Sequence, residues 1–109
     1  MKNKPFQIDA SGIVQLVDAG GACLATDRIT VDGMPVGYCY REEPDFQADS
    51  GWRFFAGDES EEYLADAENI EIYDVNTIAN YDRAILQVLD QSIGSAFVRN
   101  ADNQFKLAE

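Results

Sequence analysis

The chain has 109 residues, 46% of them hydrophobic, and its six Phe, five Tyr and one Trp are enough for one packed domain over residues 1–109. Eight basic residues against 20 acidic ones give a net charge of −12, so nucleic acid and anionic membrane surfaces are poor partners, because both attract cations. The absence of histidine excludes Ser-His-Asp and Cys-His nucleophile systems and His-ligated zinc.

The first part of the chain predicts strands joined by local turns. We expect residues 1–12 to form a loosely attached arm. The elements expected next are an apolar segment over 13–17 that could be a strand, a turn at 18–21, a buried strand over 22–26, a strand over 29–31 and a return strand over 36–41. Asp32-Gly33 lies between the last two strands and is typical of a hairpin turn.

The second part adds helices to the expected sheet. The expected elements are a loop over 42–51, an aromatic strand over 52–57 that pairs antiparallel with 36–41, a helix capped by Asp58 that runs to residue 65, a strand over 70–73, a helix over 76–89 that Asp82 interrupts, and strands over 96–99 and 105–107, with 100–109 loosely attached. This order predicts an α+β fold, a single domain with a mainly antiparallel sheet and one or two helices packed on it.

Carboxylates gather in two segments, the acidic loop (residues 42–49) and the acidic cluster (residues 58–62). Together they supply Glu42, Glu43, Asp45, Asp49, Asp58, Glu59, Glu61 and Glu62. One interpretation is a negative surface that attracts a basic protein partner. The other is a solvated loop followed by a well-capped helix.

The aromatic strand allows two interpretations as well. Trp52 and Phe55 could anchor a protein interface, because Trp and Tyr are frequent in binding hot spots. Alternatively, Trp52 and Phe54 fill the core while Arg53 and Phe55 face the other side of the sheet, and the period of two favours this arrangement. We expect Tyr38 and Tyr40 to pack in the core on the same grounds.

Other chemistry is less well supported. Close carboxylates suit Ca²⁺ or Mg²⁺, but no segment has the EF-hand order, and we expect no cofactor and no metal site. Asp49 and Asp58 are the acids to inspect for a hydrolytic carboxylate pair.

Cys23 and Cys39 are expected to be small buried hydrophobes. With no signal peptide and no membrane-spanning run in view, we expect a cytoplasmic protein, and an exposed edge at 96–99 or 105–107 would allow a homodimer.

Several segments, taken together, resemble a small bacterial family. They are 27–33, 36–44, Asp49-Ser50-Gly51-Trp52-Arg53-Phe54-Phe55, 57–59 and 73–82 with Tyr73-Asp74-Val75-Asn76-Thr77, and the resemblance spans about residues 22–99. The family was first described as a domain of unknown function and is now described as like immunity protein thirty-three of polymorphic toxin systems. The resemblance implies a single α+β domain without known enzymatic activity and a role in neutralising a toxin. It carries over no catalytic or binding residues.

We therefore expect a non-enzymatic, acidic protein-binding domain that acts as an immunity-like inhibitor of a bacterial toxin. The expected contact surface comprises the acidic loop, the acidic cluster and Trp52. A small carboxylate-based metal-binding or hydrolytic domain, and a regulatory module without a toxin partner, are the alternatives.

Overall fold

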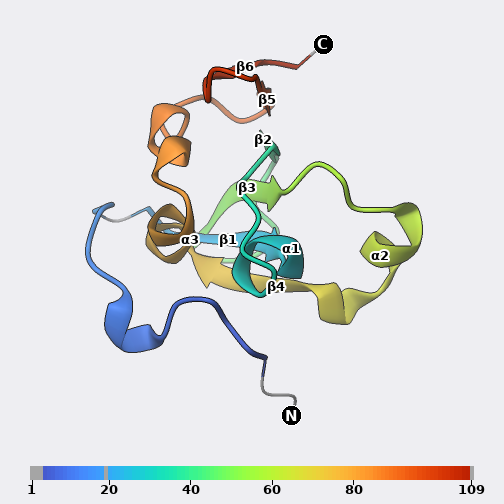
Figure 1. Ribbon diagram of the computed structural model, residues 1–109. Helices are drawn as coiled ribbons and strands as arrows, with labels where there is room; N and C mark the ends of the chain where they lie inside the picture. Colours follow the sequence, from blue (N-terminus) through green and yellow to red (C-terminus); the bar gives the residue numbers. More distant parts are fainter. Residues whose placement is uncertain (1–3, 19, 109) are drawn as a thin grey trace.

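Within residues 4–18 and 20–108, which the computed structural model describes, six strands form one sheet. In pairing order they are β4 (Ile70–Asp74), β1 (Ala22–Thr26), β3 (Asp49–Phe55), β2 (Tyr38–Arg41), β5 (Ala96–Arg99) and β6 (Phe105–Leu107) (Figure 1). The β1–β3 pair is parallel and the other pairs are antiparallel, which confirms the expected α+β fold. The expectations for residues 1–3, 19 and 109 lie outside the described residues.

The helical segments are short. They are α1 (Asp27–Thr30), α2 (Glu61–Ala65) and α3 (Val75–Tyr81), with the 3-10 turns η1 (Ala10–Gly12), η2 (Ala67–Asn69) and η3 (Arg83–Gln87). α2 lies on the opposite side of the molecule from α3 (Figure 1). As predicted, Asp82 ends the long helical pattern and caps its second part, where its side chain accepts a hydrogen bond from the Ala84 amide.

The core occupies one face of the sheet. Alternate strand residues point into it from β1, β3, β2 and β5, and α1, α3 and η3 cover them with apolar side chains; the buried set includes Cys23, Ala25, Ile29, Cys39, Trp52, Phe54, Val75, Ile78, Ile85 and Phe97. Trp52 and Phe54 fill the core, and Arg53 and Phe55 face the other way, as the period of two predicts. Cys23 and Cys39 are buried and unpaired, on strands that β3 separates.

The hairpin expected at Asp32-Gly33 is wrong. The segment expected as a strand over 29–31 forms α1 instead, whose Ile29 and Thr30 are fully buried. The Met34 amide donates to the Arg28 carbonyl, so the Asp-Gly pair closes the end of a helix. β1 is thereby free to pair with β3 and β4, and β2 pairs with β3 and β5.

The apolar segment over 13–17 does not form a strand. Asparagine side chains of α3 take the place of a strand partner: Asn76 Oδ1 accepts from the amides of Leu16 and Val17, and Asn80 Oδ1 accepts from that of Val14. These bonds give the amides of an irregular segment the acceptors that a neighbouring strand would otherwise supply. The described part of the expected arm is also attached, since the Gln7 amide donates to the Thr30 carbonyl over 2.9 Å.

The starts of β3 and α2, and one of the two expected edge strands, differ from the prediction. The predicted loop is shorter, because β3 begins at Asp49, and α2 begins at Glu61 with Ser60 as its N-cap in place of Asp58. β5 cannot be a dimer edge, since β2 and β6 occupy both its sides, whereas β6 does lie at the edge of the sheet. Among the described residues, no helix has the length and apolar character needed to cross a membrane.

Candidate protein-binding site

Arg53 of β3 is the centre around which the acidic loop folds. Its side chain lies on the sheet face opposite Trp52 and is only 2% exposed, although it carries a permanent charge. The neighbours of Arg53 in the sheet are Leu24 on one side and Tyr40 on the other. A cation buried in this way requires several hydrogen-bonded carboxylates, because an unpaired buried charge is strongly unfavourable.

Asp49 supplies the principal partner. Its carboxylate receives two parallel hydrogen bonds from Arg53, from Nη1 over 3.0 Å and from Nη2 over 2.8 Å, and it also accepts from the amides of Asp45 and Gly51. These bonds, above all those from Arg53, hold the pKa of Asp49 well below its ordinary value. The Asp49 side chain is completely buried, so this acid is a structural part of the site.

A bulge in β3 makes the pairing of Asp49 with Arg53 possible. Residues four apart in an extended strand lie roughly 13 Å apart, too far for this contact. Between the pairs Ala22–Asp49 and Leu24–Arg53, however, β1 advances two residues and β3 advances four. Gly51 lies within the extra length at φ +89°, a conformation that favours glycine.

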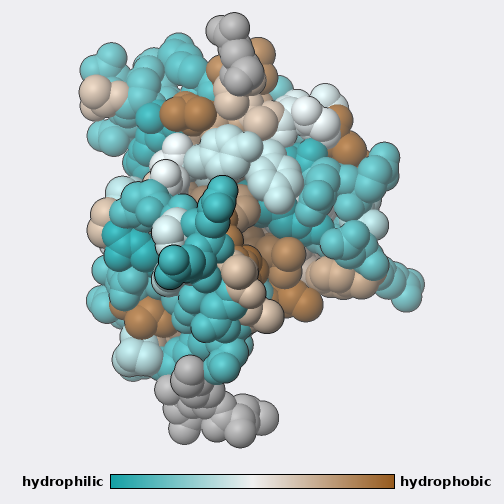
Figure 2. Space-filling model, turned by 90° about the vertical axis from the view of Figure 1, so that its right-hand side faces the viewer, coloured by the Kyte–Doolittle hydropathy of each residue, from teal (hydrophilic) through white to brown (hydrophobic). Residues whose placement is uncertain are grey.

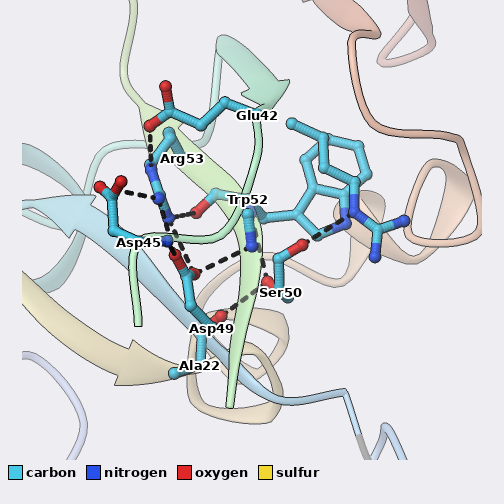
Figure 3. Close-up of polar contacts among 9 residues, drawn as sticks. Ala22, Glu42, Asp45, Asp49, Ser50, Trp52 and Arg53 are labelled. Carbon is cyan, nitrogen blue, oxygen red and sulfur yellow. Dashed lines mark hydrogen bonds and ion pairs between the residues drawn. The ribbon is translucent and has the colours of Figure 1, made fainter. Parts of the chain in front are cut away.

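Two further carboxylates of the acidic loop reach the same cation. Glu42 Oε2 accepts from Arg53 Nε over 2.6 Å, and Asp45 Oδ2 lies 3.6 Å from Arg53 Nη2 (Figure 3). Three carboxylates against one guanidinium leave two negative charges in excess, and the exposed Glu43 adds another. The acidic loop therefore presents a negative surface that an internal cation holds in shape.

The acidic cluster is organised differently. Asp58 pairs with Arg28, whose Nη2 lies 2.6 Å from Asp58 Oδ2, and Glu59 accepts from the amides of Ala56 and Gly57 and from the Thr26 hydroxyl. Hydrogen bonding to Arg28 lowers the pKa of Asp58. Glu61 and Glu62 are exposed in the first turn of α2, where negative charge suits the helix N-terminus.

The structure divides the nine residues expected at the contact surface. Asp49 and Trp52 are buried, so their side chains cannot meet a partner directly, and Trp52 belongs to the core. Glu42 and Glu59 are half-buried, while Glu43, Asp45, Asp58, Glu61 and Glu62 are exposed. The exposed carboxylates are thus the ones available for binding.

The carboxylate pair considered for hydrolysis is not formed. Asp49 starts the seven-residue β3 and Asp58 follows its far end, and each carboxylate is bound to a different arginine. Two acids at opposite ends of a strand cannot act on one bond. In the part of the chain that the structure describes, no three Cys, Asp or Glu side chains are placed to hold a metal ion.

Two features of this region were not predicted from the sequence, the buried Arg53 and the exposed face of Tyr38 and Tyr40. Arg53 could have been suspected, since it is a cation inside an otherwise apolar strand with Asp49 two alternations before it. Tyr38 and Tyr40 do not pack in the expected core; they lie half-exposed on the opposite sheet face, with their rings 5.9 Å apart. The strand pattern put both tyrosines on one face but did not say which face the helices cover.

Comparisons with known proteins give one finding. A family model described as the Immunity protein Imm33 domain matches residues 23–109. Searches of curated proteins and of solved structures found no match. The match covers most of the sheet, including β3 and the whole acidic loop. The chain belongs to the Imm33 immunity protein domain family.

Proposed function

We propose that this chain is a non-enzymatic immunity protein that neutralises a bacterial toxin by binding it through an acidic surface. Membership of the Imm33 domain family supports the toxin as the kind of partner. The observation that carries the binding mechanism is the acidic loop held around the buried Arg53, with carboxylates left in excess.

A basic partner fits this surface. Charges that are already held in place lose little conformational freedom on binding, so more of their attraction for a partner's cations appears as affinity. The net charge of −12 would also accelerate encounter with a basic protein at low salt. Toxins that act on nucleic acid need basic clefts to hold phosphate, which makes them suitable targets. We further propose a cytoplasmic location, where thiols such as Cys23 and Cys39 stay reduced.

A growth selection tests the function. Gene fragments from the source genome are expressed under an inducible promoter, with and without this chain, and fragments are kept that arrest growth only in its absence. We expect such a fragment to encode a basic protein that co-purifies with the chain at one-to-one stoichiometry. Recovery of the toxin with an altered intact mass, or protection without complex formation, would contradict inhibition by binding.

The surface is tested with charge-matched variants on the purified pair. Glu43→Gln/Asp45→Asn removes two exposed charges from the acidic loop, and Asp9→Asn/Asp102→Asn removes two exposed charges elsewhere, so the net charge of both variants is equal. We expect the loop variant to raise Kd roughly tenfold or more at low salt and to flatten its salt dependence. Equal effects of the two variants would reject the acidic loop as the contact surface.

A further inference from the structure

The sheet face opposite the core carries apolar side chains that do not belong to the core. Ile72 of β4 is 59% exposed and Val98 of β5 is 46% exposed, and the half-exposed rings of Tyr38, Tyr40 and Phe55 lie between these strands. α2 and the acidic loop border this face. Seen from the side of α2, apolar and weakly polar surface forms a band across the molecule with hydrophilic side chains on both sides (Figure 2).

The three rings form one platform on β2 and β3. The rings of Tyr40 and Phe55 are stacked at 5.7 Å with an angle of 15°, and Tyr38 lies 5.8 Å from Phe55 and 5.9 Å from Tyr40. They line a groove of about 490 Å³ whose other walls include Glu59, Leu64 and Val98. This groove, called the aromatic groove below, has room for one long side chain and its neighbours.

Carboxylates stand on two sides of the aromatic groove. Glu59 forms part of its wall, and Glu61 and Glu62 belong to α2, the helix that contributes Leu64. On the other side, Glu42 and Asp45 lie near Tyr40. Burial raises the pKa of the Tyr40 hydroxyl, and the negative charge of these two carboxylates adds to the rise. The acidic loop and the acidic cluster thus border the same groove.

We propose that the aromatic groove receives an arginine side chain of the basic toxin, with apolar neighbours of that arginine on Leu64 and Val98, which line the same groove. This inference rests on the proposed function and names the surface that carries it. A guanidinium can stack on the rings while its N–H groups fork to carboxylates, a combination that an apolar side chain cannot use and that an ammonium uses less well. The chain already stacks its own Arg41 on Trp52, with Cζ 5.7 Å from the ring centre.

A peptide titration tests the groove without the toxin. The probe is acetyl-Leu-Arg-Leu-amide, added to the ¹⁵N-labelled full chain at low salt, and the control is the same peptide with neutral citrulline in place of arginine. We expect the arginine peptide to bind weakly and to shift the amide resonances of Tyr38, Tyr40 and Phe55, while the citrulline peptide has no effect. Equal shifts with both peptides, or shifts confined to the exposed Glu61 and Glu62, would overturn the proposal.

Two variants test whether the rings themselves bind the arginine peptide. Tyr40→Thr keeps a residue that is compatible with a strand. It should weaken the binding of the arginine peptide by roughly threefold, the effect of one exposed cation–π contact. The matched control is Ile72→Thr, which removes an exposed apolar side chain from the same face three strand spacings away, about 14 Å. Melting curves check that both variants fold. A threefold loss in both variants would refute the role of the ring.

The growth selection and the peptide titration together separate the two proposals. If Tyr40→Thr/Phe55→Thr protects cells as well as the unaltered chain does, the proposal that the aromatic groove binds the toxin is wrong, and the proposed immunity function is unaffected. If no toxin is neutralised but the peptide shifts still map to the rings, the immunity function is wrong and the arginine-binding groove stands. Loss of protection with an unchanged fold supports both.

Discussion

Replacing Arg53 with methionine should strongly destabilise the fold. The change keeps most of the side-chain length but leaves the Asp49 carboxylate buried without its cation, since the Asp49 side chain is 0% exposed. Removing one partner of a buried ion pair costs about 3–5 kcal/mol. Glu42 and Asp45 remain partly in water, at 44% and 73% exposure, so we take the lower end, about 3 kcal/mol.

Thermal and urea unfolding, followed by circular dichroism at pH 7, measure this loss. For a chain of this size a loss of 1 kcal/mol lowers Tm by about 4–8 °C, so a loss of about 3 kcal/mol in Arg53→Met should lower Tm by roughly 12–24 °C. The matched control is Arg28→Met, which removes a more exposed cation that is also paired with two carboxylates, and its effect should be much smaller. Equal decreases in Tm for the two variants would refute the reasoning.

The pH dependence of the free energy of unfolding supplies a second check, because the contribution of Asp49 changes with pH in opposite directions in the unaltered chain and in Arg53→Met. In the unaltered chain the folded pKa of Asp49 lies below its unfolded value, so its stabilising contribution is present above about pH 4 and is lost as the pH falls through the folded pKa. In Arg53→Met, burial without a cation raises the folded pKa of Asp49, so acidification stabilises this variant. The difference in the free energy of unfolding should therefore shrink as pH falls from 7 to 3. A difference that is constant over this range would show that Asp49 and Arg53 are not coupled.

Three further predictions concern other parts of the fold. Gly51→Ala should lower the free energy of unfolding by about 3 kcal/mol in urea melts, because the new Cβ would lie 2.1 Å from the Glu42 carbonyl oxygen at a positive φ. Asp82→Ala should cost about 2–3 kcal/mol in the same assay, because the carboxylate accepts hydrogen bonds from two backbone amides and a guanidinium. Cys23 and Cys39 should not react with a thiol reagent at pH 8 until urea unfolds the chain, because burial raises the pKa of both thiols, that of Cys39 to about 12.

Local signals in the sequence predicted the elements that depend on near neighbours. The antiparallel pair β2–β3 follows from two apolar runs joined by a charged loop, and its register places Cys39 opposite Phe54 in the core. The break at Asp82 is equally local, because its side chain caps the backbone two residues later. In both cases the interacting groups lie close in the chain, so propensity and periodicity are sufficient.

Long-range pairing could not be predicted in this way. The parallel pairing of β1 with β3 joins segments about 27 residues apart, and it depends on α1 turning the chain directly after Thr26. A four-residue helix has almost no stability of its own and exists because Ile29 and Thr30 are buried. Asp-Gly carries the same turn signal after a helix as between two strands, so the hairpin was the more common interpretation but the wrong one here.

The candidate site shows the same division. The carboxylates of the acidic loop were evident from composition, but which of them are free depends on a cation that comes next to Asp49 through a bulge. Periodicity alone places Asp49 and Arg53 on one face at a separation too large for contact. The aromatic groove was equally hidden, because the pattern of β2 gives two faces and only the packing of α1 and α3 decides which one is buried.

Net charge and the aromatic groove explain different parts of the proposed recognition. The charge of −12 acts over several ångströms and speeds the approach of any basic protein, so by itself it cannot select one toxin. Selection requires a shape that only some cations fill. A platform of three rings between two acidic segments meets that requirement, because it favours a planar guanidinium with apolar neighbours over a dispersed positive charge. Salt should therefore weaken the binding of all basic proteins, whereas loss of the rings should weaken the binding of the toxin alone.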